Sequence, residues 1–142
     1  MSAYSISMNN ILSGLGAKEL NHAPVVSGLT LDSRATKPGD LFVALAGARR
    51  HGLKYLGEAI HRGCAAVLWE NDAGTACEQL RDHADLPQAG IENLSKQLGH
   101  LADRFFRQPS ADMQIIGVTG TNGKSSCVHL IGQAAKELVD HS

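Results

Sequence analysis

The sequence has few cysteines, almost no net charge and no long apolar run, and each of these absences argues against a class of protein. Its three cysteines, Cys64, Cys77 and Cys127, are odd in number and lack metal-ligand spacing, which argues against a disulfide framework or a zinc site. A formal net charge of −1 supplies no bulk attraction to nucleic acid or to an anionic membrane surface. No apolar run is long enough to span a bilayer, and no basic stretch precedes an apolar one at the N-terminus, so we expect a cytoplasmic protein without membrane insertion.

The composition that remains is that of a globular protein, and its pattern predicts a parallel α/β sheet. Hydrophobic residues make up 43% of the 142 positions, enough for one domain, or for one small domain with part of a second. Strands are expected at residues 25–31, 41–45 and 64–69. A turn at 37–40 separates the first two, and a helix at 53–60, closed by Gly63, separates the last two. Strand, helix and strand in this order form a βαβ unit, whose strands are parallel.

Three further helices are expected outside this unit: one at residues 8–15, one at 73–84, and one that follows the connection near residue 91. The last is the clearest, because its apolar side chains share one face and Pro109 follows to end it. That face consists of Leu94, Leu98, Leu101, Ala102 and Phe105. Residues 87–91, which begin with a proline and contain a glycine, are expected to form a short connection. We therefore place a boundary there, with one domain at 1–91 and the beginning of another at 92–142.

The stretch with the most specific chemistry lies near the C-terminus, at residues 113–126. Met113–Val118 is an apolar, β-branched run typical of a buried parallel strand. Gly120-Thr121-Asn122-Gly123 is a tight turn in which both glycines can take positive φ, and Lys124-Ser125-Ser126 opens a helix expected to reach Asp140. Strand, glycine turn, Lys-Ser and helix together predict a loop that binds the phosphates of a nucleotide.

Each part of the loop at residues 120–126 can contribute to the binding of ATP and Mg²⁺. The N–H groups of the turn converge on one point, where the helix N-terminus adds partial positive charge. Lys124 brings a full charge to the β- and γ-phosphates, and the Ser125 hydroxyl can complete a Mg²⁺ shell. The general signature places its first glycine where this chain has Val118, so the loop is a variant. An ordinary βα turn, with glycines used only for geometry, is the alternative.

The second domain begins with one helix, one strand and this loop. A nucleotide-binding domain of the doubly wound kind needs several more parallel strands, and no carboxylate on a later strand can be assigned to Mg²⁺. We therefore expect the chain to be the front of a longer protein and to be inactive as an enzyme by itself.

Three stretches together resemble the N-terminal part of the Mur ligases. They are Leu31-Asp-Ser-Arg34, then Pro38-Gly-Asp-Leu-Phe-Val-Ala-Leu45 with Gly47 and Gly52, and then Gly117-Val-Thr-Gly-Thr-Asn-Gly-Lys-Ser125. Within that family, the Asp-Ser-Arg form and the Thr-Asn-Gly-Lys loop are most similar to the MurE type. The phosphate loop alone is also similar to that of folylpolyglutamate synthases, but the first two stretches are not.

The resemblance implies ATP-dependent amide formation in peptidoglycan biosynthesis. ATP would phosphorylate the glutamate carboxylate of UDP-N-acetylmuramoyl-L-alanyl-D-glutamate, and a diamino acid, meso-diaminopimelate or L-lysine, would attack the acyl phosphate. By position, Leu31, Ser33 and the loop Ala48-Arg49-Arg50 would bind the uridine end of this substrate, within domain 1–91. The residues assigned to ATP are Gly120, Thr121, Asn122, Gly123, Lys124, Ser125 and Ser126, with Lys124 as the catalytic residue and Ser125 as the Mg²⁺ ligand.

The residues themselves leave other interpretations open. Arg49 or Arg50 could pair with a diphosphate as a fork donor, or both could be solvated loop charges. Ser33 could stabilise a turn, and a local ion pair is the favoured interpretation for Asp32 with Arg34. For the whole chain, the alternatives are a non-catalytic uridine-nucleotide-binding module with a vestigial phosphate loop, and an ATPase of the folylpolyglutamate-synthase type.

Overall fold

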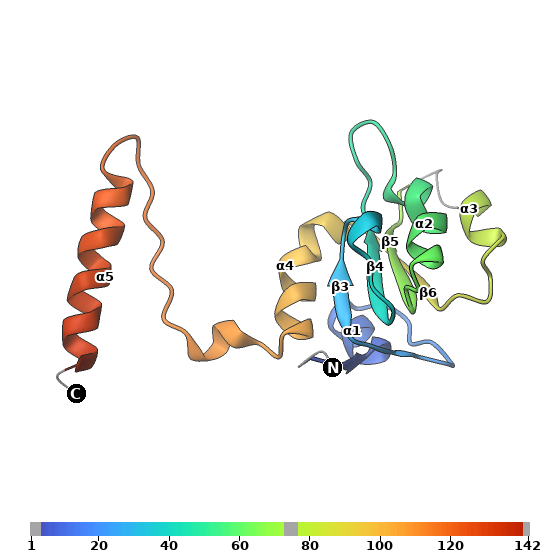
Figure 1. Cartoon of the computed structure of the whole chain (residues 1–142), viewed down its shortest axis with the longest axis horizontal. Coiled ribbons are helices and arrows are strands. Elements are labelled where there is room, and N and C mark those ends of the chain that lie inside the picture. Colours follow the sequence, from blue (N-terminus) through green and yellow to red (C-terminus); the bar gives the residue numbers. More distant parts are fainter. Residues whose placement is uncertain (1–3, 73–76, 141–142) are drawn as a thin grey trace. The chain divides into compact units, whose positions relative to one another are not determined.

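The computed structural model describes residues 4–72 and 77–140, and it divides into two compact units, Met1–Pro109 and Ser110–Ser142 (Figure 1). The first unit is built on a four-stranded sheet in which every neighbouring pair is parallel. In spatial order the strands are β3 (Gly28–Thr30), β4 (Asp40–Ala44), β5 (Ala66–Glu70) and β6 (Gln88–Ile91). The predicted parallel α/β sheet is therefore confirmed, with the strand expected at 41–45 at an inner position and starting one residue earlier.

Helices cover both faces of this sheet, because alternate residues of the inner strands point to opposite sides. Leu41 and Val43 of β4 pack with α1 (Met8–Gly14) and α4 (Leu94–Phe105) in one core. Phe42 and Ala44 pack in a second core with α2 (Leu56–His61), the 3-10 turn Gly52–Tyr55 before it, and α3 (Cys77–Arg81). All five residues of β4 are buried, which is why this segment reads as a continuous apolar run.

The predicted helices near α1, α2 and α4 are confirmed, and two glycine turns behave as expected. Gly63 follows α2 with φ +92° and its N–H donates to the Ile60 carbonyl oxygen at 2.8 Å, as a C′ glycine does. Gly39, in the 37–40 turn, has φ +88°. The helix α4 ends at Phe105, before Pro109, because Arg107 and Gln108 take positive φ. Residues 73–76 of the helix expected at 73–84 lie outside the described residues.

The strand expected at residues 25–31 is in fact two strands. Val25–Val26 forms β2, which pairs antiparallel with β1 (Ile6–Ser7), whereas Gly28–Thr30 forms β3 in the main sheet. The break falls at Ser27, whose N–H donates to the Gly39 carbonyl oxygen at 2.9 Å. One apolar run is thus shared between two sheets, a choice of partners that local sequence does not specify.

The connection expected at residues 87–91 was wrong, because Gln88–Ile91 is the strand β6, paired with β5. Its sequence Gln-Ala-Gly-Ile has little β propensity, and only Ile91 is buried. The compact unit also continues past the boundary expected at residue 91. Leu94, Leu101 and Phe105 of α4 lie in the same core as α1, so this helix packs with the first unit.

Among its described residues, the second unit has one α-helix, α5 (Lys124–Asp140), which has the predicted bounds. The buried strand expected at Met113–Val118 was wrong: residues 113–120 form no strand, and Met113, Ile115 and Ile116 are 56%, 73% and 65% exposed. A strand needs a neighbour to accept its ladder of hydrogen bonds, and the part of the chain that the structure describes pairs none with this run. No helix among the described residues is both long and apolar enough to cross a membrane.

Candidate functional site

The carboxyl ends of the parallel strands meet at one edge of the sheet, where the loops after β3, β4 and β5 emerge together. In open α/β sheets this edge is the usual place for a ligand. A pocket of about 440 Å³ opens there between the loop after β3 and the start of α2. Its lining residues are Leu31, Asp32, Ser33, Arg34, Tyr55 and Glu58. Leu31 and Ser33, both predicted to bind a ligand, are thus brought into one pocket.

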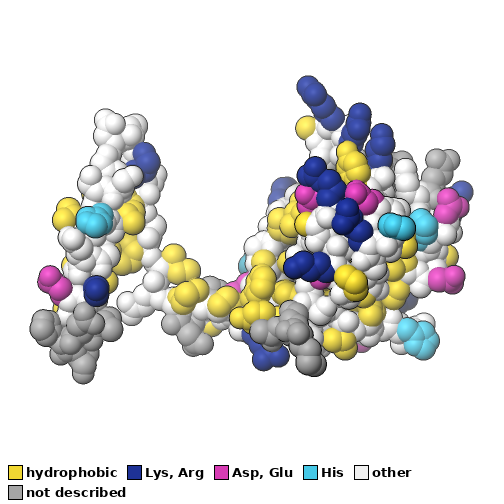
Figure 2. Space-filling view, in the orientation of Figure 1, with side chains coloured by type: hydrophobic (Ala, Val, Ile, Leu, Met, Phe, Trp, Pro, Cys, Tyr) yellow, Lys and Arg dark blue, Asp and Glu magenta, His cyan; other side chains and the backbone are white. Residues whose placement is uncertain are grey.

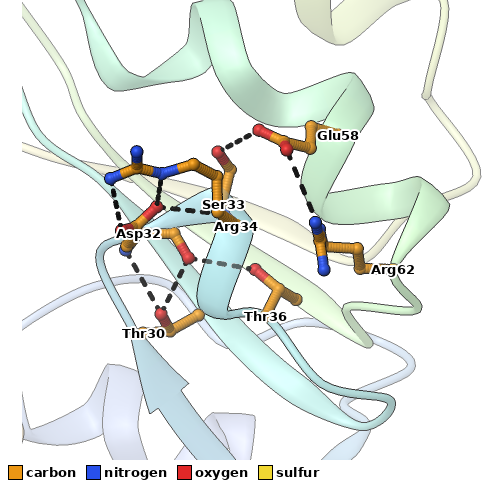
Figure 3. Close-up of polar contacts among 7 residues, drawn as sticks. All are labelled: Thr30, Asp32, Ser33, Arg34, Thr36, Glu58 and Arg62. Carbon is orange, nitrogen blue, oxygen red and sulfur yellow. Dashed lines mark hydrogen bonds and ion pairs between the residues drawn. The ribbon is translucent and has the colours of Figure 1, made fainter.

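Ser33 and Glu58 form the polar centre of this pocket (Figure 3). Ser33 begins a short 3-10 turn, and its buried Oγ donates a hydrogen bond of 2.6 Å to Glu58 Oε2 on α2. Glu58 Oε1 lies 3.8 Å from Arg62 Nε, one turn further along the same helix. The Ser33 hydroxyl therefore ties the loop to the helix, and the half-exposed carboxylate keeps acceptor capacity for a ligand hydroxyl.

Asp32 and Arg34 form the local ion pair that the sequence favoured. Asp32 Oδ1 accepts from Arg34 Nε and from the Arg34 N–H, both at 3.0 Å, while Oδ2 accepts from Nη2 at 2.9 Å (Figure 3). The hydrogen bond from the Arg34 side chain is the main reason that the pKa of Asp32 lies below its ordinary value. Thr30 and Thr36 hydroxyls donate to the Asp32 carbonyl oxygen and shape the turn. Because the guanidinium is already paired, Arg34 adds little net charge to the pocket.

The loop predicted to hold a diphosphate projects from the same edge of the sheet. Its stems Ala46 and His51 form an antiparallel bridge, and the Gly47 N–H donates to the Arg50 carbonyl oxygen at 3.2 Å. Ala48, Arg49 and Arg50 at the tip are exposed and do not line the pocket. Figure 2 shows Lys and Arg side chains gathered over this end of the first unit, which makes it the electropositive part of the face in view.

Sequence reasoning missed two residues of the pocket, Tyr55 and Glu58. Both lie on the solvent side of the segment predicted as a helix at 53–60, three residues apart, opposite the buried Leu53 and Leu56. Helical periodicity marks them as surface residues, but only the fold shows that this surface faces Leu31 and Ser33. With Leu31 and Tyr55 the pocket gains an apolar wall, which suits a planar ring, beside a hydroxyl and a carboxylate.

The phosphate loop lies in the second unit and has the backbone shape that its glycines predict. Gly120 and Gly123 have φ +149° and +76°, and the Gly123 carbonyl oxygen accepts the N–H of Cys127 at 3.0 Å as α5 begins. The first N–H groups of a helix have no partner within it, so those of Lys124, Ser125 and Ser126 are available to an anion. The Lys124 ammonium donates to the carbonyl oxygens of Gly120 and, at 3.4 Å, Thr121.

A divalent cation would find few protein ligands at this loop. Among the residues that the structure describes, no group of three or more His, Cys, Asp or Glu side chains could hold a metal ion. Ser125, on the first turn of α5, is the one residue here predicted as a ligand. Mg²⁺ commonly takes one or two protein oxygens and completes its shell with waters and substrate phosphates, so this residue set fits an ion that arrives with a nucleotide.

A larger hollow of about 590 Å³ runs along the edge strand β3. It is lined by Ser27–Thr30 and by residues of the segment 35–40, and it contains none of the predicted site residues. The smaller pocket is the better candidate, because it joins apolar, hydroxyl and carboxylate groups beside the cationic loop.

Comparison with known proteins gives one family. The family model described as "Mur ligase family, catalytic domain" matches residues 25–106. The chain is 44% identical over 112 residues to the UDP-N-acetylmuramoyl-L-alanyl-D-glutamate–2,6-diaminopimelate ligase of Alkalilimnicola ehrlichii, covering 76% of this chain and 22% of that protein. It is 47% identical over 113 residues to the ligase of the same name from Xanthomonas campestris, covering 77% and 21%. The chain thus spans about a fifth of the length of these relatives.

Solved structures agree in fold. A UDP-N-acetylmuramoylalanyl-D-glutamyl-2,6-diaminopimelate–D-alanyl-D-alanyl ligase from Acinetobacter baumannii superposes with a TM-score of 0.65 at 17% identity, over 97% of this chain and 29% of that one. A crystal structure of MurF from the same organism gives a TM-score of 0.61 at 18% identity, over 87% of this chain and 26% of that one. At these identities the likeness concerns the fold alone.

Proposed function

This chain belongs to the Mur ligase family, and we propose that it is the front part of an ATP-dependent amide ligase that adds a diamino acid to UDP-N-acetylmuramoyl-L-alanyl-D-glutamate in peptidoglycan biosynthesis. Its relatives at 40–47% identity are named 2,6-diaminopimelate ligases, which supports diaminopimelate as that diamino acid in preference to L-lysine. The family match at residues 25–106 does not include the phosphate loop, which speaks against a folylpolyglutamate-synthase-type ATPase that shares only that loop.

The pocket at the carboxyl edge of the first unit is the proposed site for the uridine end of the substrate. Leu31 and Tyr55, 49% and 44% exposed, offer apolar surface to the planar base. The Ser33 hydroxyl and the Glu58 carboxylate offer polar partners to the ring edge or the ribose hydroxyls. The proposal rests on this pocket, whose residues all lie within the family match at 25–106.

The exposed loop Ala48-Arg49-Arg50 is the proposed clamp for the diphosphate that follows the ribose. A guanidinium donates two parallel hydrogen bonds to a phosphate, so even one of the two arginines would fix the orientation of the diphosphate. Cations gathered at this end of the unit would also speed the encounter with an anionic substrate. We propose that residues 1–91 hold the substrate's nucleotide. The segment from 92 to 142, whose helix α4 packs in the core of the first unit, would begin the ATP-binding part.

The phosphate loop Gly120–Ser126 is the proposed ATP site. Its free N–H groups would hold the phosphates, Lys124 would neutralise charge on the β- and γ-phosphates, and Ser125 would take one position on Mg²⁺. When bound, ATP supplies the phosphoryl group that activates the glutamate carboxylate for attack by an amine. The chain's own residues here bind and orient; the acyl transfer needs the amine to be delivered as well.

Calorimetric titration tests the uridine assignment directly. UDP-N-acetylmuramoyl-L-alanyl-D-glutamate is titrated into the 142-residue chain, with ADP and an adenosine analogue of the sugar nucleotide as controls. We expect the uridine ligand to bind at millimolar concentration or below without ATP, and Ser33→Ala to weaken it several-fold. Equal affinity for the uridine and adenosine ligands, or no binding, would contradict the proposed site.

A further inference from the structure

Glu70, the last residue of β5, is a buried carboxylate with hydrogen bonds to two other parts of the fold. It is 7% exposed. Its Oε2 accepts the Ala46 N–H at 3.0 Å, and its Oε1 accepts the Ser95 N–H at 3.2 Å and the Ser95 hydroxyl at 2.6 Å. Each carboxylate oxygen is therefore satisfied by the protein, so this acid is built into the structure as an acceptor and not left to meet a ligand.

The backbone of Glu70 holds the opposite side of the same loop. The Glu70 carbonyl oxygen lies 2.9 Å from His51 Nε2, while His51 Nδ1 accepts the Leu53 N–H at 3.1 Å. Because Nδ1 is the acceptor, Nε2 carries the hydrogen and donates a hydrogen bond to the Glu70 carbonyl oxygen. Ala46 and His51 are the two stems of the arginine loop, residues 47–50, and they face each other as a bridge. One residue thus fastens both stems, through its carboxylate and through its carbonyl.

The third attachment is to the start of α4. Asn93 stands at the N-cap in the left-handed conformation, with φ +51°, and its side chain makes no capping hydrogen bond. Glu70 reaches Ser95, in the first turn, and places a negative charge at the positive end of the helix. The carboxylate therefore does for α4 what an N-cap side chain normally does, but from a neighbouring strand.

We propose that Glu70 is a positioning residue for the arginine loop: it fixes the two stems, so that Arg49 and Arg50 are presented to the diphosphate without a large loss of loop entropy on binding. The role in binding rests on the proposed function of the loop. Tip residues 48–50 are exposed. Without Glu70 the loop would keep its bridge and the backbone hydrogen bonds from Gly47 to Arg50 and from Gly52 to Leu45, but its stems would lose their attachment to β5, and the ligand would have to order them. Glu70 itself touches no substrate; it acts through the Ala46 N–H and the His51 ring.

The test compares Glu70→Ala with Ser95→Ala in the whole 142-residue chain. Glu70→Ala removes the loop bond and the helix bond together, whereas Ser95→Ala removes only the side-chain bond at α4 and keeps the bond to Ala46. Amide hydrogen exchange of residues 46–51 reports loop order, and calorimetry with UDP reports affinity. We expect Glu70→Ala to speed loop exchange and to raise the Kd for UDP about tenfold. We expect Ser95→Ala to lower the Tm while leaving both loop exchange and Kd unchanged.

A double variant separates this inference from the proposed function. Arg49→Ala with Arg50→Ala should weaken UDP binding, and adding Glu70→Ala to it should have no further effect on Kd, since the groups being positioned are gone. If the arginine variant binds UDP normally, the assignment of the loop to the diphosphate is wrong. Amide hydrogen exchange of residues 46–51 in Glu70→Ala would still test whether Glu70 orders the loop. Unchanged loop exchange in Glu70→Ala, or equal loosening by Ser95→Ala, would overturn the positioning role.

A second variant covers the case in which Glu70→Ala does not fold. Glu70→Gln keeps the side-chain volume but has one acceptor oxygen in place of two, so it cannot serve both Ala46 and the two donors of Ser95. We expect the Ser95 donors to retain that oxygen, so that exchange rises at Ala46 and UDP binds more weakly. Normal exchange at Ala46 in a folded Glu70→Gln chain would count against the proposal.

Discussion

At the scale of single residues, Glu70 is a buried carboxylate that the sequence does not distinguish from the other acids. Burial acts to raise the pKa of Glu70, but hydrogen bonds from the Ser95 hydroxyl and from the N–H groups of Ala46 and Ser95 outweigh it, and the pKa lies below the ordinary value of 4.5. A pKa depressed in the folded state adds stability above the unfolded-state value, and this is lost as the pH falls through the folded value.

We therefore expect Glu70 to make the unfolding free energy depend on pH below about 4.5, with stability decreasing toward acid. Glu70→Ala should remove that part of the dependence and, at pH 7, should cost about 1–3 kcal/mol, because the Ala46 and Ser95 N–H groups lose their acceptor. Urea unfolding of the unchanged protein and of Glu70→Ala, between pH 3 and 7, measures the unfolding free energy of each. A parallel fall of the two stability curves below pH 4.5 would show that other acids are responsible.

At the scale of the element, α2 offers two glycines whose substitution should have opposite effects. Gly63 ends the helix at φ +92°, and a Cβ added there would lie 3.2 Å from Pro38 Cα. Gly57 lies within the helix, exposed, with open space around an added Cβ. We expect Gly63→Ala to destabilise the chain by about 1 kcal/mol or more, and Gly57→Ala to stabilise it by about 0.5–1 kcal/mol. Thermal unfolding of both variants measures these effects. A rise in Tm for Gly63→Ala would contradict the assignment of Gly63 as the C′ residue of α2.

Some elements could be predicted from the sequence, and others could not. Leu41–Ala44 and Leu94–Phe105 carry their own patterns, a continuous apolar run and one apolar helical face. The strand was predicted to within a residue at each end, and the helix was predicted from its apolar face. Gln88–Ile91 became a strand through pairing with β5, and Met113–Val118 did not become one for want of a partner. Pairing is a property of the fold, and neither segment encodes it locally.

The same distinction applies to the site. Leu31 and Ser33 were found because they adjoin a strand in a recognisable stretch, and the structure places both in one pocket. Tyr55 and Glu58 carry no such mark, and neither does Glu70 beneath the loop. Their positions depend on which loop faces which helix, so only the folded structure shows that they belong to the site.

At the scale of the whole molecule, the proposed chemistry needs more than a phosphate loop. Residues 113–123 and α5 are largely exposed, and no group of three metal-ligating side chains is present among the residues that the structure describes. Phosphoryl transfer depends on positioning and charge stabilisation, and a loop without rigid support supplies little of either.

We therefore expect residues 1–142 to release no phosphate from Mg-ATP in the presence of UDP-N-acetylmuramoyl-L-alanyl-D-glutamate and meso-diaminopimelate. Lys124→Ala should change nothing measurable in this chain, although it should abolish activity in a longer protein that carries the same residues. A phosphate-release assay on residues 1–142, with and without Lys124→Ala, tests this prediction. Turnover that disappears in Lys124→Ala would mean that this chain is a small self-sufficient ATPase.

The most direct test of the account is to map where each nucleotide binds on the isotopically labelled chain. We predict that UDP-N-acetylmuramoyl-L-alanyl-D-glutamate shifts the amide resonances of residues 31–34 and 48–50 at submillimolar to millimolar concentration and leaves those of 120–126 in place. ADP with Mg²⁺ should leave the first two segments unaffected. Shifts confined to residues 120–126 with the uridine ligand, or the same shifts at 31–34 with ADP, would contradict the claim that this unit is a uridine-nucleotide site.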